Sequence, residues 1–262
     1  MAPAQETSLF ALTPSSVAIT SHRSASGCRN NRRRRLPPAT GEERSVPTAA
    51  DATVRAVLDR DGEALAHAPL ARQVNALETI VSSNPVASVL VERLPELGLP
   101  SWYLGAGAVA HTVWNHLHSF PPAHAINDYD VVYFDPDDLT ESREADIQAQ
   151  ITSLLGEHRA KVDATNEARV HVWYERRFAR PLTPYRSVEH AIATWPTTAT
   201  SVGVRRQGRH VAVCAPFGLA DLFSMTVRAN TTLIDRAVYE SKATRWRNVW
   251  PQLTVLPWPS AT

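Results

Sequence analysis

Apolar residues recur at three- and four-residue steps in the first part of the chain, which is the spacing of one helix face. Val74, Leu77 and Ile80 follow Leu70 in this way and predict a helix from Leu70 onward. The sequence Asn84-Pro85 then supplies an N-cap residue and a proline for the first turn of a second helix. A further helical pattern begins near Ala52, so we interpret residues 51–100 as N-terminal helices that pack on the core of a domain formed by residues 101–262.

Later segments combine β-branched and aromatic residues and predict a small sheet. Residues 128–134 form a strand-like run that Asp135-Pro136 closes, and residues 161–174 are expected to be extended because apolar residues alternate at their end. A β-prone run at 197–204 and a turn at Gln207-Gly208 predict a hairpin with 210–215. Helical patterns cover 139–158, 188–193, 219–227 and 234–250. This order predicts an α/β protein of the α+β type, a small mixed sheet flanked by helices.

Composition and charge separate the first 50 residues from the rest. The chain has 262 residues and a net charge of +1, but residues 1–50 carry seven Arg and three Glu, which leaves −3 for the remainder. The remainder is therefore not a basic nucleic-acid binder. Residues 1–50 are rich in Arg, Ser and Pro without apolar periodicity, which indicates a disordered tail. A transit peptide, an upstream start codon and a nucleic-acid arm built on Arg32–Arg35 remain alternatives.

Cysteine use and hydropathy bear on the location of the protein. Cys28 and Cys214 are the two cysteines of the chain, and Cys28 lies in the predicted tail, so a disulfide framework is not expected. This fits a reducing compartment, and we expect a cytoplasmic protein. No run reaches the ~18 apolar residues that a membrane span needs.

Two carboxylates near the start of the predicted strand are the main candidates for chemistry. Asp128 and Asp130 are two residues apart, so their side chains share one strand face about 6.6 Å apart along the chain. Mg²⁺, or Mn²⁺, would relieve their repulsion, because Mg²⁺ binds one or two carboxylates and completes its shell with water and phosphate oxygens. If the strand that starts near Lys161 pairs with this one, Asp163 becomes a third carboxylate. An acid pair with this spacing also arises often by chance.

A turn of small residues precedes the acid pair. Gly105-Ala106-Gly107 lies between an apolar strand-like segment and a helical run, where backbone N–H groups and a helix N-terminus are available to phosphate. On its own, such a turn usually does no more than join two elements.

Together these features resemble the nucleotidyltransferase superfamily of the DNA polymerase β type, in which a glycine-bearing loop and helix precede a strand with two acids and a third acid lies on a later strand. The span from about Leu94 to Leu253 also resembles a bacterial nucleotidyltransferase subfamily that takes its name from the fold. The blocks that carry this resemblance are Trp102–Gly107, Val113-Trp114, Asn127–Asp135, Asn166–His171, Trp195–Thr200, Ala215–Leu219, Asp221–Phe223 and Trp250-Pro251.

The resemblance implies a polymerase β-like fold and specific residue roles. Asp128 and Asp130 would bind the metal with Asp163, which would also deprotonate an incoming hydroxyl. Gly105, Ala106 and Gly107 would form the phosphate loop, although the superfamily usually places Gly or Ser at the position of Ala106. An offset strand would present Glu167 in place of Asp163.

Arg169 is a candidate for the nucleotide phosphate, with pairing to a neighbouring acid as the equal alternative. The expected reaction is metal-dependent transfer of a nucleoside monophosphate from a nucleoside triphosphate to an unidentified acceptor. Two other readings stay open: a catalytically silent binding or antitoxin-like module on the same fold, and an Asp-x-Asp glycosyltransferase that uses a nucleotide-sugar.

Overall fold

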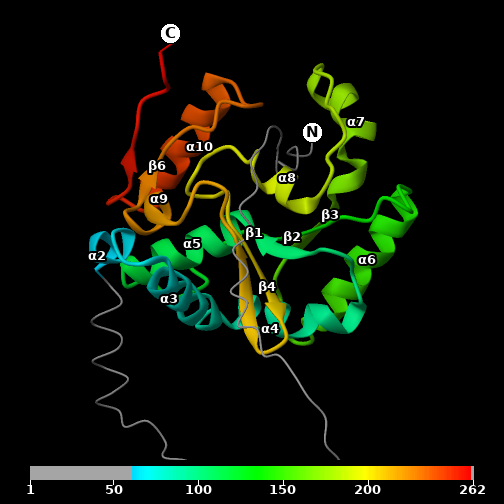
Figure 1. Cartoon of the computed structure of the whole chain (residues 1–262), viewed down its shortest axis with the longest axis horizontal. Coiled ribbons are helices and arrows are strands. Elements are labelled where there is room, and N and C mark those ends of the chain that lie inside the picture. Colours follow the sequence, from blue (N-terminus) through cyan, green and yellow to red (C-terminus); the bar gives the residue numbers. More distant parts are fainter. Residues whose placement is uncertain (1–60, 261–262) are drawn as a thin grey trace, which may run out of the picture.

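The computed structural model describes residues 61–260 (Figure 1). The predicted tail at 1–50 and the start of the helical pattern near Ala52 lie outside the described residues. Within 61–260, none of the helices is long and apolar enough to cross a membrane.

The helices begin where local capping chemistry predicts. Asn84 accepts hydrogen bonds from the backbone N–H groups of Val86 and Ala87, and Thr140 accepts one from Arg143, so both residues are N-caps. These caps confirm the predicted helix starts. The longer helices are α3 (Leu70–Ser82), α4 (Pro85–Arg93), α5 (Ala106–Leu117), α6 (Glu141–Leu154), α7 (Val170–Phe178) and α10 (Arg236–Val249). The short ones are α2 (Gly62–Ala66), η1 (Leu94–Leu97), η2 (Glu167–Arg169), α8 (Val188–Ile192) and α9 (Ala220–Phe223).

A five-stranded mixed sheet lies at the centre, with strand order β3-β2-β1-β4-β5. Its strands are β1 (Tyr103–Gly105), β2 (Tyr129–Tyr133), β3 (Val162–Asn166), β4 (Gly203–Gln207) and β5 (His210–Cys214). Strands β2 and β3 are parallel, and the other neighbours are antiparallel. A second, two-stranded sheet joins β6 (Thr226–Val227) to β7 (Thr254–Val255). The predicted fold class, a small mixed sheet flanked by helices, is therefore confirmed.

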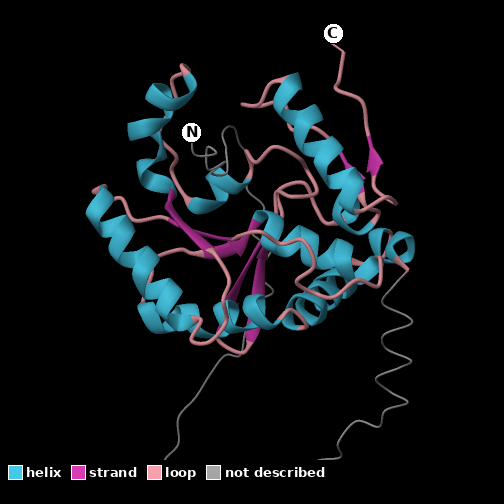
Figure 2. Ribbon diagram, turned by 180° about the vertical axis from the view of Figure 1, so that it is seen from behind, coloured by secondary structure: helices cyan, strands magenta, loops and turns pink. Residues whose placement is uncertain are grey.

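The two faces of the central sheet bury different side chains. Leu104, Val131 and Val204 point to one face and join a large core with residues of α3, α4, α5 and α6. Tyr103 and Val132 point to the other face, where they meet Trp195 and residues of α8. In Figures 1 and 2, α7 and α10 stand apart on the side of the sheet away from α3 and α4. The second face is covered by α8 and Trp195, and it also carries the side chain of Asp130.

One predicted strand segment is wrong. The chain leaves β3 at Asn166, whose side chain caps η2 by accepting from Ala168, and then continues as the helix α7. Val170 and Tyr174 are four residues apart and share the buried helix face, whereas Val172 is 58% exposed. The alternation of apolar residues fitted a strand, but a side chain that caps the next turn ends the strand first.

Two other segments are shorter than predicted. The Thr-rich run at 197–202 is a turn held by a hydrogen bond of 2.8 Å between the hydroxyls of Thr197 and Thr200, and β4 begins only at Gly203. The helix predicted for 219–227 contains only α9, after which β6 pairs with β7 from the end of the described chain. Bonds to distant residues also act in both places, because the N–H of Thr198 donates to the carbonyl of Arg228 and β6 pairs with β7.

Candidate active site

Asp130 and Asp163 are neighbours in the sheet. Asp130 on β2 is paired with Asp163 on β3 in the parallel register, so their side chains leave the same face of the sheet. Asp128, two residues before Asp130, lies just outside the start of β2. The structure therefore brings the three predicted acids together on the face that carries Tyr103 and Val132.

The carboxyl group of Asp130 lies in an unfavourable electrostatic environment. It is 9% exposed, and burial raises its pKa to about 8, with further contributions from the negative charges of Asp128 and Asp163. Lys242 and Lys161 oppose this shift. A cation bound beside Asp130 would therefore stabilise the ionised form of its carboxyl group.

Lys161 is the cation nearest to two of the acids. Its ammonium nitrogen lies 2.5 Å from Oδ2 of Asp163 and 3.6 Å from Oδ2 of Asp128. Lys161 was not selected from the sequence, although its position two residues before Asp163, just before β3 begins, was a usable signal. The ammonium group bridges the carboxylates that would otherwise repel each other.

The turn of small residues follows β1 directly. Gly105 is paired with Asp130 on one side and with Gly203 on the other, so the turn lies beside the acids. A Cβ atom at Gly105 would lie 2.4 Å from a ring carbon of Trp195, which leaves no space for a side chain. Glycine is therefore required at this position for packing, whatever the turn binds.

Ala106 and Gly107 differ in whether their backbone N–H groups are available to a ligand and in the space around them. Ala106 has a φ of 51°, in the left-handed region, and donates its backbone N–H to the carbonyl of Val202 at 3.1 Å. The first N–H groups of any helix have no intrahelical partner, and in α5 no capping side chain accepts from them. Gly107 has more space, because a Cβ atom there would meet only the ring of His111, at 3.0 Å.

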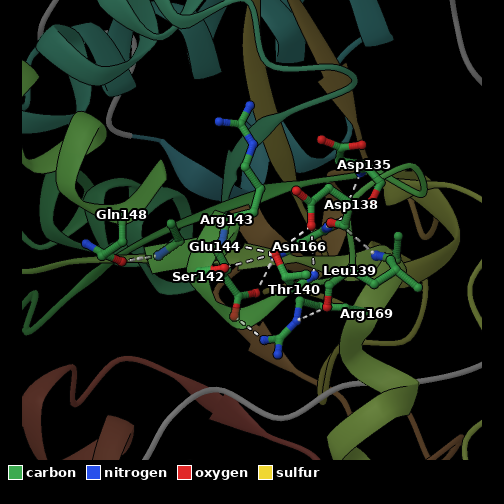
Figure 3. A network of polar contacts seen from close by, with 12 residues as sticks. Asp135, Asp138, Leu139, Thr140, Ser142, Arg143, Glu144, Gln148, Asn166 and Arg169 are labelled. Atoms are coloured by element: carbon green, nitrogen blue, oxygen red, sulfur yellow. Dashed lines mark hydrogen bonds and ion pairs between the residues drawn. The ribbon is translucent and has the colours of Figure 1, made fainter. Parts of the chain in front are cut away.

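Arg169 does not lie in this site; it belongs to a polar network between β3 and the start of α6 (Figure 3). Its guanidinium group pairs with Glu144 and donates to the carbonyl of Leu139 at 3.1 Å. Asn166 donates to the carbonyl of Asp135 at 2.8 Å and accepts from the N–H of the same residue at 3.0 Å. Of the two alternatives for Arg169, the structure favours pairing with an acid, and this pair joins η2 to α6.

Glu167 lies behind the acids in a buried position. It is 1% exposed, and neither carboxyl oxygen has a hydrogen-bond partner. Burial, together with the charges of Glu144 and Asp130, raises its pKa to about 8. The parallel register aligns Asp163 with Asp130, so the offset that would present Glu167 in its place does not occur.

The acids suit a divalent cation by their chemistry. Among residues 61–260, no three His, Cys, Asp or Glu side chains are arranged closely enough to hold a metal ion as they stand. The donor set nevertheless fits Mg²⁺, because Asp130, Asp163 and the adjacent Asp128 are carboxylates on one face, and burial together with the charges of Asp128 and Asp163 raises the pKa of Asp130. An ion there would replace the ammonium group of Lys161.

Comparisons with known proteins agree with this geometry. A family model described as nucleotidyltransferase matches residues 92–255. A solved structure described as revealing a CCA-adding enzyme head domain has a TM-score of 0.58 and 20% sequence identity, and the alignment covers 74% of this chain and 100% of the other. At that identity the likeness shows the fold alone. No curated protein matches the chain.

Proposed function

Because this chain belongs to the nucleotidyltransferase family whose model covers residues 92–255, we propose that it transfers a nucleoside monophosphate from a nucleoside triphosphate to an acceptor, with a divalent metal ion. The observation that carries the proposal is the parallel register of Asp130 with Asp163, which gathers acids from two strands beside the turn at Gly105. Acids on one sheet face are the arrangement that metal-dependent phosphoryl transfer requires.

The three acids share one role in the proposed reaction, and Asp163 has a second one. Asp128, Asp130 and Asp163 would hold the metal ions, and the chemistry that bound ions would supply is neutralisation of the charge that develops on the phosphoryl oxygens. The acceptor oxygen bonds to the α-phosphorus as the bond to the bridging oxygen breaks and pyrophosphate leaves. Asp163 accepts the proton of the acceptor hydroxyl. It suits this role because its partner Lys161 is half exposed and free to withdraw into solvent.

The turn after β1 supplies uncharged donors. Gly105 and Ala106 set the position of the turn, and Gly107 begins the stretch of first-turn N–H groups in α5. These groups and the helix dipole favour a phosphate oxygen at the helix N-terminus. Catalysis in this proposal consists of positioning and charge neutralisation, as in phosphoryl transfer in general.

The test is pyrophosphate release from each labelled nucleoside triphosphate with Mg²⁺ or Mn²⁺, with and without candidate hydroxyl and phosphate acceptors. Asp130→Asn is expected to abolish release, and Asp146→Asn on the exposed side of α6 is the matched control. Full activity of Asp130→Asn would contradict the proposal. Triphosphate binding without turnover would favour the silent binding module, and consumption of a nucleotide-sugar would favour the glycosyltransferase.

A further inference from the structure

One flank of helix α7 is exposed to solvent. Val172 and Arg176 are four residues apart, and so are Trp173 and Arg177, so these four side chains share that flank. Val172 is 58% exposed, Trp173 is partly exposed, and both arginines are exposed. Glu175, the acid of α7, lies on the other flank. The exposed flank therefore combines an aromatic ring with two cations.

A third cation follows the end of α7. Arg180 is exposed, and one nitrogen of its guanidinium group donates to the carbonyl of Leu233 at 2.9 Å, which fixes the side chain. Three arginines thus lie within the five residues 176–180, in a chain whose residues 51–262 carry a net charge of −3. Within residues 61–260, none of these three arginines forms an ion pair. Their charge is therefore available to an anionic partner.

Aromatic rings hold the middle arginine in place. The guanidinium carbon of Arg177 lies 5.5 Å from the ring centroid of Phe178 and 6.0 Å from that of Trp173. A cation at this distance is attracted to the face of an aromatic ring. The rings of Trp173 and Phe178 also contact each other edge to face, with their centroids 6.3 Å apart. The cationic and aromatic groups therefore lie side by side in an ordered arrangement.

The apolar side of α7 is already occupied. Val170 and Tyr174 are buried and pack with Leu182 and Tyr185. A basic helix that lies on a membrane inserts such an apolar side among the lipids, whereas here that side is inside the protein. The partner of the exposed flank is therefore recognised by surface charge and by a ring, without insertion of the helix.

We propose that Trp173, Arg176, Arg177 and Arg180, called the α7 patch below, bind a single-stranded nucleic acid. Cations spaced along a surface follow a phosphate backbone, and a guanidinium group can contact two phosphate oxygens at once. A partly exposed ring gives an unpaired base a surface on which to stack, and this combination is typical of proteins that bind single strands. A duplex can use only the cations, because its bases are stacked on one another.

This inference goes beyond the proposed function and does not depend on it. The net charge of residues 51–262 argues against a basic surface over the whole domain, but a short strand needs cations only along its own path. In Figures 1 and 2, α7 projects from the side of the central sheet that faces away from α3 and α4, which is also the side of the candidate active site.

The experiment measures binding of labelled single-stranded RNA and DNA, each about 12 nucleotides long, to the full chain by fluorescence anisotropy over a series of salt concentrations. Arg176→Ala and Arg177→Ala are each expected to weaken binding and to reduce the slope of log affinity against log salt by about 0.7. Arg176→Lys keeps the charge and should keep the slope. Trp173→Leu is expected to weaken binding about tenfold at every salt concentration, because stacking releases no counterions.

Arg209→Ala, at an exposed arginine in the turn between β4 and β5, is the matched control and should bind as the wild type does. Residues 1–50 carry seven arginines in every variant, so differences between the variants report on the α7 patch. Melting temperatures check that each variant is folded. No triphosphate is present in the assay, so failure of the proposed function would leave these results unchanged.

Three results overturn the inference: no binding of the single strands by the wild type, wild-type affinity in the arginine-to-alanine variants of the α7 patch, or an equal loss of affinity in Arg209→Ala. Wild-type affinity in Trp173→Leu would contradict stacking and, with it, the choice of a single strand. Equally tight binding of a duplex, of polyglutamate or of vesicles that contain phosphatidylserine would also overturn it, because charge alone would then select the partner.

Discussion

Trp195 lies against the backbone of Gly105 so closely that a Cβ atom on Gly105 would come within 2.4 Å of its indole ring. Trp195 is fully buried, and the carbonyl of Val202 lies 3.0 Å from the same point. The two glycines of the turn therefore have different structural roles. Gly105 is fixed by packing, whereas Gly107 borders the first-turn N–H groups that we assign to phosphate.

Gly105→Ala is expected to destabilise the protein by about 1–3 kcal/mol, because overpacking displaces the indole ring or the end of β1. Gly107→Ala meets only the ring of His111 and should change stability less, while it weakens triphosphate binding. Chemical denaturation and calorimetric titration measure the two effects. A stable Gly105→Ala protein with lost binding would show that the steric account is wrong.

Lys161→Ala is expected to tighten Mg²⁺ binding several-fold. The ammonium group of Lys161 and a metal ion compete for the oxygens of Asp163 and Asp128, so removal of the lysine removes the competitor. Without divalent ions the same variant should melt at a lower temperature, because the carboxylates then repel each other unscreened. Mg²⁺ titrations followed by melting temperature measure both effects, and Arg159→Ala, an exposed cation nearby in the chain, is the control. Unchanged Mg²⁺ affinity would place the metal elsewhere.

Glu167→Gln is expected to stabilise the protein at neutral and alkaline pH. The folded protein keeps the proton of Glu167 up to about pH 8, whereas the unfolded chain releases it near its ordinary pKa of 4.5. Between these values the wild type loses stability as the pH rises, because folding must retain a proton that the unfolded chain gives up. Glutamine stays neutral with the same shape and removes this loss.

Denaturant unfolding from pH 5 to pH 9 measures the effect of Glu167→Gln. The free energies of unfolding of the variant and the wild type should be nearly equal at pH 5 and diverge toward pH 8. Glu157→Gln, on the exposed turn after α6, is the control and should follow the wild type throughout. Parallel profiles for Glu167→Gln and the wild type would mean that the carboxyl group finds a partner on ionisation.

Arg169→Ala is expected to lower the free energy of unfolding by about 3–5 kcal/mol, because it leaves Glu144 without its ionic partner in a largely buried place. Arg169→Lys should recover only part of this loss, since lysine cannot pair with Glu144 and reach the carbonyl of Leu139 in the same geometry. The affinity of the folded variants for triphosphate should be unchanged. If Arg169→Ala had normal stability but had lost its affinity for triphosphate, Arg169 would have to be assigned to phosphate binding.

The sequence by itself determined the features that depend on neighbours along the chain. The caps at Asn84 and Thr140, the turn at Gln207-Gly208 and the spacing of Asp128 and Asp130 are local, and each lies where it was predicted. The blocks from Trp102 to Pro251 were enough to indicate the family and the fold class.

The tertiary structure decided what distant segments do to one another. An apolar alternation of five residues cannot distinguish a strand from a short helix, and β3 ends at Asn166, whose side chain is held by the backbone of the distant residue Asp135. The register of β2 with β3 places Asp163, and not Glu167, beside Asp130. Arg169 pairs with Glu144 and lies outside the candidate site. These outcomes rest on contacts between residues far apart in the chain, because burial and charge neutralisation act through space and leave no local pattern to read.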